Sequence, residues 1–236
     1  MKDKEILMQV REACEKNEIL KNANPSSMAK MVSYGMLREY RKGETIFRER
    51  EEVTKLYFLV EGCVALYRIN RNQDRKVIFV LGHREMLNEV ILQEPVASIS
   101  CMALTDVKIL SFTRRQFKEI VEQDFELSAR VMDSLAKKLR RCYHQLSNTP
   151  NAMRLDRQVA SKLWKLGRDF GQEKDGQVKI CFELSITFLA DMVGAKRETV
   201  SRVVKKLSDE GLIEVKKNYF YLSSLEELRE YVLSVE

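Results

Sequence analysis

The side chains best suited to chemistry lie between Lys196 and Lys205, and they are groups that recognise nucleic-acid bases. An arginine can donate two hydrogen bonds to guanine, and a glutamate can accept one from the amino group of cytosine. Glu198 and Arg202 are four residues apart, so a helix would place them on one face, where they could also brace each other. The segment therefore predicts a DNA-reading face made of Lys196, Arg197, Glu198, Thr199, Ser201, Arg202 and Lys205.

Two short helices are expected to hold this face. Apolar residues from Leu189 to Val193 have the spacing of one helical face. Gly194 follows, where a tight turn between helices needs a residue that tolerates positive φ. A second apolar stripe runs from Val200 to Leu207. The pattern predicts a helix-turn-helix. The alternative is an ordinary amphipathic helix pair whose charged face is only solvated.

The residues after this helix pair predict a wing. Residues 211–215 and 219–222 read as two strands, and residues 216–218 read as the turn between them. The turn begins with Lys216 and Lys217, two cations placed to contact phosphate. The C-terminal part of the chain is therefore predicted to be a winged helix.

The bulk composition favours a globular protein but is a weak guide to its partners. Hydrophobic residues make up 44% of the 236 residues, and no apolar run is long enough to span a bilayer. The N-terminus lacks the apolar core of a signal peptide, so we expect a cytoplasmic protein without a membrane partner. The net charge is +6, yet residues from Pro150 onward hold 15 basic and 14 acidic side chains. The prediction of DNA binding therefore rests on where the charges lie.

The cysteines and histidines exclude several kinds of site. The five cysteines are scattered and form no CxxC pair, and the chain has only two histidines. This pattern argues against a disulfide framework and against a zinc site, so no metal is expected. Most of the cysteines are expected to be small buried hydrophobic residues.

Two further regions lie upstream of the winged helix. Short β-rich runs separated by turn residues predict an antiparallel sandwich or barrel, at 45–47, 55–60, 63–69, 76–80, 99–103 and 107–112. Residues 114–146 then read as one helix without Gly or Pro. The expected domains are a β-barrel domain at 1–113, a helix at 114–148 and a DNA-binding domain at 149–236.

That long helix carries a narrow apolar stripe. Its members are spaced 3, 4, 3 and 4 residues apart, which is typical of a coiled-coil seam. Lysines and arginines flank it, which suits a partner helix better than the chain's own barrel. The expected interface is a parallel homodimer seam made of Met132, Leu135, Leu139, Cys142 and Leu146.

Three strings carry a resemblance to a known family: KGETI at 42–46, LYFLVEGCV at 56–64 and VGAKRETVSR at 193–202. With a β-barrel, a long helix and a winged helix, the chain resembles the Crp/Fnr family of bacterial transcription regulators from about residue 19 to residue 224. The resemblance implies an α+β fold: a double-stranded β-helix, the jelly roll of cyclic-nucleotide-binding domains, then a dimerisation helix and a winged helix-turn-helix. It also implies a homodimer that binds double-stranded DNA and RNA polymerase under the control of a small-molecule effector.

The two best-known branches of that family read DNA with different residues. The resemblance implies that Arg197, Glu198 and Arg202 read bases in the manner of the cyclic-AMP-dependent branch. It implies Glu198, Ser201 and Arg202 for the oxygen-sensing branch. This chain has all four residues and is similar to a composite of the two.

The effector segment departs from both branches. Cyclic-AMP binders of the family show a Gly-Glu pair and a later Arg that pairs with the cyclic phosphate. Here Glu89 matches, but Asn88 replaces the glycine and Ala97 stands where the arginine belongs. A buried phosphate without a cation is costly, so cyclic AMP is not expected. The expected pocket is mainly apolar and suits an unidentified organic ligand or haem; its predicted residues are Met86, Leu87, Asn88, Glu89 and Ser98.

Other cofactors and other classes of protein fit the sequence less well. An iron–sulfur cluster of the oxygen-sensing type needs closely spaced N-terminal cysteines, and only Cys14 lies there. His83 could ligate haem, although a surface turn histidine is the simpler interpretation. An enzyme is not expected, because no phosphate loop or nucleophile elbow is present. A winged-helix interaction module without DNA binding stays open as an alternative.

Overall fold

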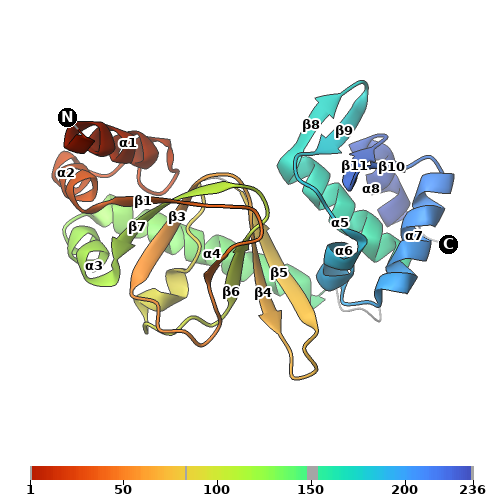
Figure 1. The fold of residues 1–236 in the computed structure, drawn as a ribbon, viewed down its shortest axis with the longest axis horizontal. Coiled ribbons are helices and arrows are strands. Elements are labelled where there is room, and N and C mark those ends of the chain that lie inside the picture. The colour runs from red at the N-terminus through yellow and green to blue at the C-terminus, as the bar shows by residue number, and fades with distance from the viewer. Residues whose placement is uncertain (1, 83, 148–153, 235–236) are drawn as a thin grey trace. The chain divides into compact units, whose positions relative to one another are not determined.

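The computed structural model describes residues 2–82, 84–147 and 154–234. It consists of two compact units (Figure 1). One unit holds residues up to 68 together with 79–143, and the other holds 69–78 together with the residues from 144 onward. No described helix is both long enough and apolar enough to cross a membrane.

The first unit begins with two helices, α1 (Lys2–Lys16) and α2 (Pro25–Tyr34). Asn24 starts α2 by accepting a hydrogen bond from the backbone N–H of Ser27, and a proline occupies the first turn, where its missing N–H costs nothing. Both helices and the segment between them contribute buried side chains to the core of this unit, among them Val10 of α1, Leu20 of the connecting segment and Met31 of α2.

Two antiparallel sheets follow, which confirms the predicted jelly roll. One has the strand order β1 (Met36–Tyr40), β7 (Val107–Thr113), β3 (Lys55–Glu61), and the other has β2 (Thr45–Phe47), β6 (Ser100–Ala103), β4 (Val64–Ile69), β5 (Arg75–Leu81). Both sheets supply side chains to one core, at whose centre Phe58, Phe112 and Phe117 pack with ring centroids 5.3–5.9 Å apart. Strand β1 was not predicted.

The prediction of a single helix over residues 114–146 was wrong, because two helices occupy this range. Helix α3 (Arg114–Glu122) ends at Gln123, and α4 (Phe125–Ser147) begins after Asp124. The buried Asp124 carboxylate accepts hydrogen bonds from the backbone N–H groups of Leu127 and Asn24, so it caps α4 and stabilises the break. The chain therefore changes direction without a glycine or a proline.

The second unit contains helix α5 (Leu155–Phe170), the hairpin β8 (Gly171–Lys174) and β9 (Gln177–Ile180), helices α6 (Ile186–Val193) and α7 (Arg197–Asp209), strands β10 (Ile213–Lys216) and β11 (Tyr219–Leu222), and helix α8 (Leu225–Leu233). Its four strands have the order β10, β11, β9, β8. Gly167 of α5 permits the close packing of this unit, because a Cβ atom there would lie 2.3 Å from Leu222 Cδ1. The winged helix-turn-helix is confirmed, and β8 is an addition to it.

The cysteines match their prediction only in part. None of the five forms a disulfide within the described part of the chain, but only Cys14 and Cys101 are buried, and Cys181 is exposed. Burial raises the pKa of the Cys14 thiol to about 12, so this side chain behaves as an uncharged core residue.

Candidate nucleic-acid interface and effector segment

The helix-turn-helix is shaped by two local features of the sequence. Ser185 caps α6, since its hydroxyl accepts a hydrogen bond of 3.0 Å from the backbone N–H of Phe188. Gly194 ends α6 in the left-handed region with φ +77°, and its N–H donates to the Ala190 carbonyl. The chain then turns directly into α7, as the position of the glycine predicts.

Helix α7 is anchored by one face, which leaves the other face free. Val200, Val204 and Leu207 are buried against the rest of the unit. The residues predicted to read DNA are all exposed on the remaining surface of α7 and at its N-cap: Lys196, Arg197, Glu198, Thr199, Ser201, Arg202 and Lys205.

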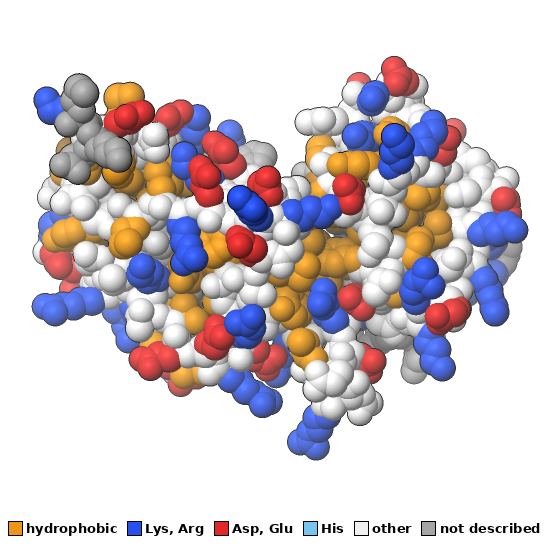
Figure 2. Space-filling view, in the orientation of Figure 1, with side chains coloured by type: hydrophobic (Ala, Val, Ile, Leu, Met, Phe, Trp, Pro, Cys, Tyr) orange, Lys and Arg blue, Asp and Glu red, His pale blue; other side chains and the backbone are white. Residues whose placement is uncertain are grey.

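The charged members of this set are available to a partner. Among the described residues, none of Lys196, Arg197, Glu198, Arg202 and Lys205 forms an ion pair, so the predicted brace between Glu198 and Arg202 is not formed. Figure 2 shows basic side chains, with acidic ones among them, along the edge where Figure 1 draws α7. An unpaired guanidinium has all its donors free to bond a base edge.

The wing presents its two lysines differently. Lys217 and Asn218 form the turn with φ values of 49° and 63°, and both are exposed. Lys216 is exposed too, but its ammonium lies 2.7 Å from a carboxylate oxygen of Glu214 and 5.5 Å from the ring centroid of Tyr221. Lys217 is therefore the freer cation of the two.

The predicted effector segment is mostly buried. Met86, Leu87, Asn88 and Glu89 are each 3% exposed or less, and Ser98 is exposed. The Asn88 side chain accepts from the Tyr57 N–H and donates to the Lys55 carbonyl, both at 2.9 Å. Asn88 therefore fixes the segment to β3, a role that the glycine of cyclic-AMP binders cannot fill.

Helix α4 holds the same segment from its other side. The Glu89 carboxylate accepts a hydrogen bond of 2.7 Å from Ser134 and one of 2.5 Å from the Lys138 ammonium. Lys138 also donates to the Met86 carbonyl at 2.6 Å, and Arg141 pairs with Glu85 at 3.1 Å. Both oxygens of Glu89 are thus engaged within the protein.

A separate stripe of α4 is exposed. Met132, Leu135, Leu139 and Leu146 are 41–72% exposed, as a helix seam that awaits a partner would be. Cys142 is only half exposed, because it lies between this stripe and the face that contacts Glu89. The sequence interpretation missed Tyr143, which is 61% exposed and lies four residues after Leu139.

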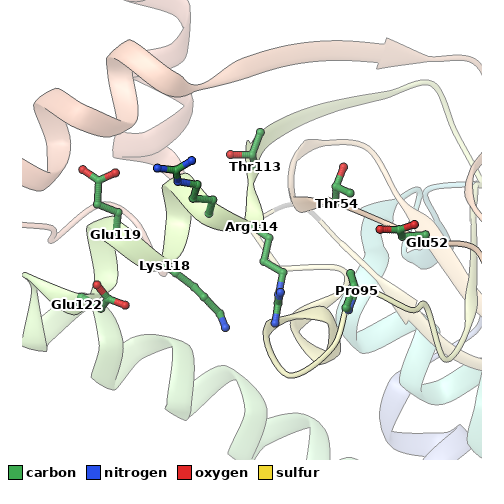
Figure 3. A pocket seen from close by; sticks show the side chains of 9 residues that line it. Glu52, Thr54, Pro95, Thr113, Arg114, Lys118, Glu119 and Glu122 are labelled. Atoms are coloured by element: carbon green, nitrogen blue, oxygen red, sulfur yellow. The ribbon is translucent and has the colours of Figure 1, made fainter.

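A groove on the first unit lies apart from these sites. His83 is outside the described residues. A groove of about 690 Å³ lies between α3 and the loops around Glu52 and Pro95, and Figure 3 shows Arg114 directed toward Pro95. Its lining carries cations and carboxylates alike, and Arg114 already bonds the Leu92 and Gln93 carbonyls. None of the predicted effector residues lines this groove.

Two family models match the chain, one after the other along the sequence. The cyclic nucleotide-binding domain matches residues 37–124, and the Crp-like helix-turn-helix domain matches residues 157–231. The chain belongs to the Crp/Fnr family of transcription regulators. Because the Crp/Fnr family consists of transcription regulators, the enzyme hypothesis is set aside.

Individual Crp/Fnr proteins are similar over most of the chain. The CRP-like cAMP-activated global transcriptional regulator of Mycobacterium tuberculosis is 25% identical over 211 residues, covering 89% of this chain and 94% of that protein. The cyclic AMP receptor protein of Thermus thermophilus is 26% identical over 192 residues, covering 81% and 85%. The solved structure of FixK2 from Bradyrhizobium japonicum matches with a TM-score of 0.73 at 19% identity, over 86% of this chain and 99% of that one, and shares the fold.

Proposed function

We propose that this regulator binds an inverted-repeat DNA site through α7, as a homodimer. The observation that carries the proposal is the exposed face of α7, where Glu198, Arg202 and Lys205 form no ion pair within the described part of the chain. Arg202 would bond a guanine, and Glu198 would accept from the cytosine amino group on the complementary strand. Arg197 and Ser201 would act at the outer positions of each half-site.

The other predicted contacts complete this interface. Lys196, Thr199 and Lys205 lie on the same surface of α7 as the base readers. Lys216 and Lys217 would touch only phosphate from the wing. The expected half-site has a TGA-like core, close to TTGA or TGTGA.

The homodimer is proposed from the exposed stripe of α4. Two copies of Met132, Leu135, Leu139 and Leu146, with Cys142 at the edge, would bury these apolar side chains against each other. The lysines and arginines beside the stripe would stay in solvent. The proposed domains span residues 1–113, 114–148 and 149–236.

The sensor is proposed to take a small organic effector that is not cyclic AMP. Support comes from Ala97, which is buried where the family's phosphate-binding arginine would stand, and from Glu89, whose oxygens are already bonded. The segment from Met86 to Glu89, with Ser98, is the proposed binding region. Haem sensing through His83 is the second candidate, and an absorbance spectrum of freshly purified protein would show its Soret band.

Selection of bound sequences from randomised duplex DNA tests the proposal. Recovery of an inverted repeat with a TGA core is the expected result. If the selection yields no inverted repeat, the protein does not bind DNA as a homodimer through α7. The alternative of an interaction module is separated by replacing Arg197 and Arg202 with alanine, because DNA affinity should collapse only if α7 reads DNA. RNA polymerase as a partner and action in the cytoplasm belong to the same proposal.

A further inference from the structure

A polar cluster in the second unit joins three segments that are far apart in the sequence. Asp156 lies in the first turn of α5, Lys206 in the second half of α7 and Tyr231 in α8. One carboxylate oxygen of Asp156 accepts from the Lys206 ammonium at 2.7 Å and from the Tyr231 hydroxyl at 3.0 Å. The ammonium also lies 3.1 Å from that hydroxyl, so the three groups bond one another in a closed triangle.

The triangle has one buried corner, Asp156, and one exposed corner, Lys206, whose side chain is 43% exposed. The Asp156 side chain is only 10% exposed, and its second oxygen accepts from the backbone N–H of Arg157 at 3.0 Å. Burial alone would raise the pKa of Asp156, but the hydrogen bonds from Lys206 and Tyr231 outweigh it and lower that pKa. The carboxylate is therefore charged across the neutral pH range, and its charge-assisted hydrogen bonds are stronger than neutral ones.

Lys206 and its neighbour Lys205 have different surroundings. The Lys205 side chain is exposed and has no ion-pair partner among the described residues, whereas the Lys206 ammonium is committed to Asp156. Consecutive residues on a helix point about 100° apart, so the two lysines leave α7 in different directions. Charge alone cannot distinguish them, but the structure does.

We propose that Asp156, Lys206 and Tyr231 are positioning residues that fix the recognition helix for base readout. The apolar anchors Val200, Val204 and Leu207 hold α7 against the domain, but apolar contacts are non-directional. Directional bonds from α5 and α8 set the rotation of α7 about its own axis. This inference rests on the proposed function, because it concerns how α7 reads DNA.

The test compares positioning variants with a contact variant in the full-length protein. Asp156→Asn, Lys206→Met and Tyr231→Phe each remove part of the triangle, and Lys205→Met is the matched control. Affinity is measured for the selected inverted repeat and for a scrambled duplex of equal length, over a range of salt concentrations. Circular dichroism at the assay temperature establishes that each variant is folded.

The positioning variants should lose discrimination without losing a phosphate contact. For Asp156→Asn and Lys206→Met the ratio of specific to scrambled affinity should fall about tenfold, and for Tyr231→Phe about threefold. Their salt slopes should match the wild type. Lys205→Met should weaken binding to both duplexes and reduce the salt slope by about one, with the ratio preserved. The double variant of Asp156 and Lys206 should lose less than the sum of the single losses.

The outcomes separate the two proposals. A wild-type protein with no preference for any inverted repeat would overturn the proposed function. A wild-type protein with that preference, and folded positioning variants that retain it, would overturn the positioning network alone. If Asp156→Asn does not fold, Tyr231→Phe still decides, because it deletes only one hydroxyl. A salt slope that falls in Lys206→Met as in Lys205→Met would also overturn the network, since Lys206 would then be a phosphate contact.

Discussion

Arg202 and Lys217 are both exposed cations, yet they are expected to act on DNA in different ways. Arg202→Ala should cost roughly 1–3 kcal/mol on the selected site and flatten the preference at one base pair, because a bidentate contact to guanine is lost. Lys217→Ala should weaken all sequences equally and reduce the salt slope by about one. Lys216→Ala should change the slope less, since that ammonium is already paired with Glu214. Binding titrations against single-base variants of the site, repeated at several salt concentrations, check this. Equal loss of discrimination in all three variants would contradict it.

The Asp124 carboxylate should make stability depend on pH. Burial would raise its pKa, but hydrogen bonds from the backbone N–H groups of Asn24 and Leu127 outweigh burial and hold the pKa below its ordinary value. Its stabilising effect is therefore complete above the unfolded-state pKa, near 3.9, and is lost as the pH falls through the lower folded-state value. Asp124→Asn should reduce the free energy of unfolding by about 1–2 kcal/mol at pH 7. Urea unfolding at pH 7 and at pH 3 should show the difference from wild type shrinking at the lower pH; a constant difference would refute the role of the charge.

Ala97 and Glu89 lead to a prediction about ligand choice. Cyclic AMP would bring a phosphate to a site where the resemblance places an arginine and this chain has the buried Ala97. Its ribose hydroxyl would compete with Ser134 and Lys138 for the Glu89 carboxylate. Isothermal titration of the purified protein should therefore show no micromolar binding of cyclic AMP. Micromolar binding would show that another cation replaces the missing arginine.

At the scale of single elements, helix α4 carries the prediction about assembly. Replacing Leu135 and Leu139 with glutamate should give monomers, because a dimer would bury unpaired charges along its seam. Lys137→Glu is the matched control, since Lys137 is exposed on the far side of α4 from that stripe and its variant should stay dimeric. Light scattering or native mass spectrometry at micromolar concentration measures the outcome. A double variant that remains dimeric would place the interface elsewhere.

Elements with strong local signals were predictable, and elements defined by distant contacts were not. Strand β2 and the turn at Gly194 follow from residue type and spacing, and both are observed. The break between α3 and α4 was missed because it depends on Asp124 bonding Asn24, which is one hundred residues away in the sequence. Strand β1 was missed because it is recognisable mainly by its pairing with β7.

The residues of the candidate sites also fall into those that local sequence predicts and those that depend on distant contacts. The polar face of α7 could be predicted because a helix presents residues at fixed spacing, so exposure follows from the buried stripe. The ties of Glu89 to α4 could not, since nothing local in Lys138 distinguishes it from Lys137. The triangle around Asp156 likewise joins three segments whose sequences give no hint of contact.

At the scale of the whole molecule, the proposed homodimer predicts a strict dependence on half-site spacing. Two recognition helices related by a two-fold axis meet the same face of DNA when half-sites lie about one helical turn, or roughly 10 base pairs, apart. Inserting about five base pairs at the centre would turn one half-site to the opposite face. Gel-shift titration should then show affinity falling to that of a single half-site. An insertion of a full turn that binds less well than the half-turn insertion would rule out this geometry.

Helix α4 has two distinct faces. One forms hydrogen bonds to Glu89 and Met86, and the other exposes Leu135 and Leu139. A ligand that moves the segment from Met86 to Glu89 would either break the bonds from Ser134 and Lys138 or move the helix that carries the seam. Thermodynamic linkage makes this coupling mutual. If the ligand strengthens dimerisation by some factor, dimerisation strengthens ligand binding by the same factor. In the proposed homodimer, the second copy of the chain would thus act as an effector of the first. The ligand concentration to which the regulator responds would then be set partly by how much of the regulator the cell makes.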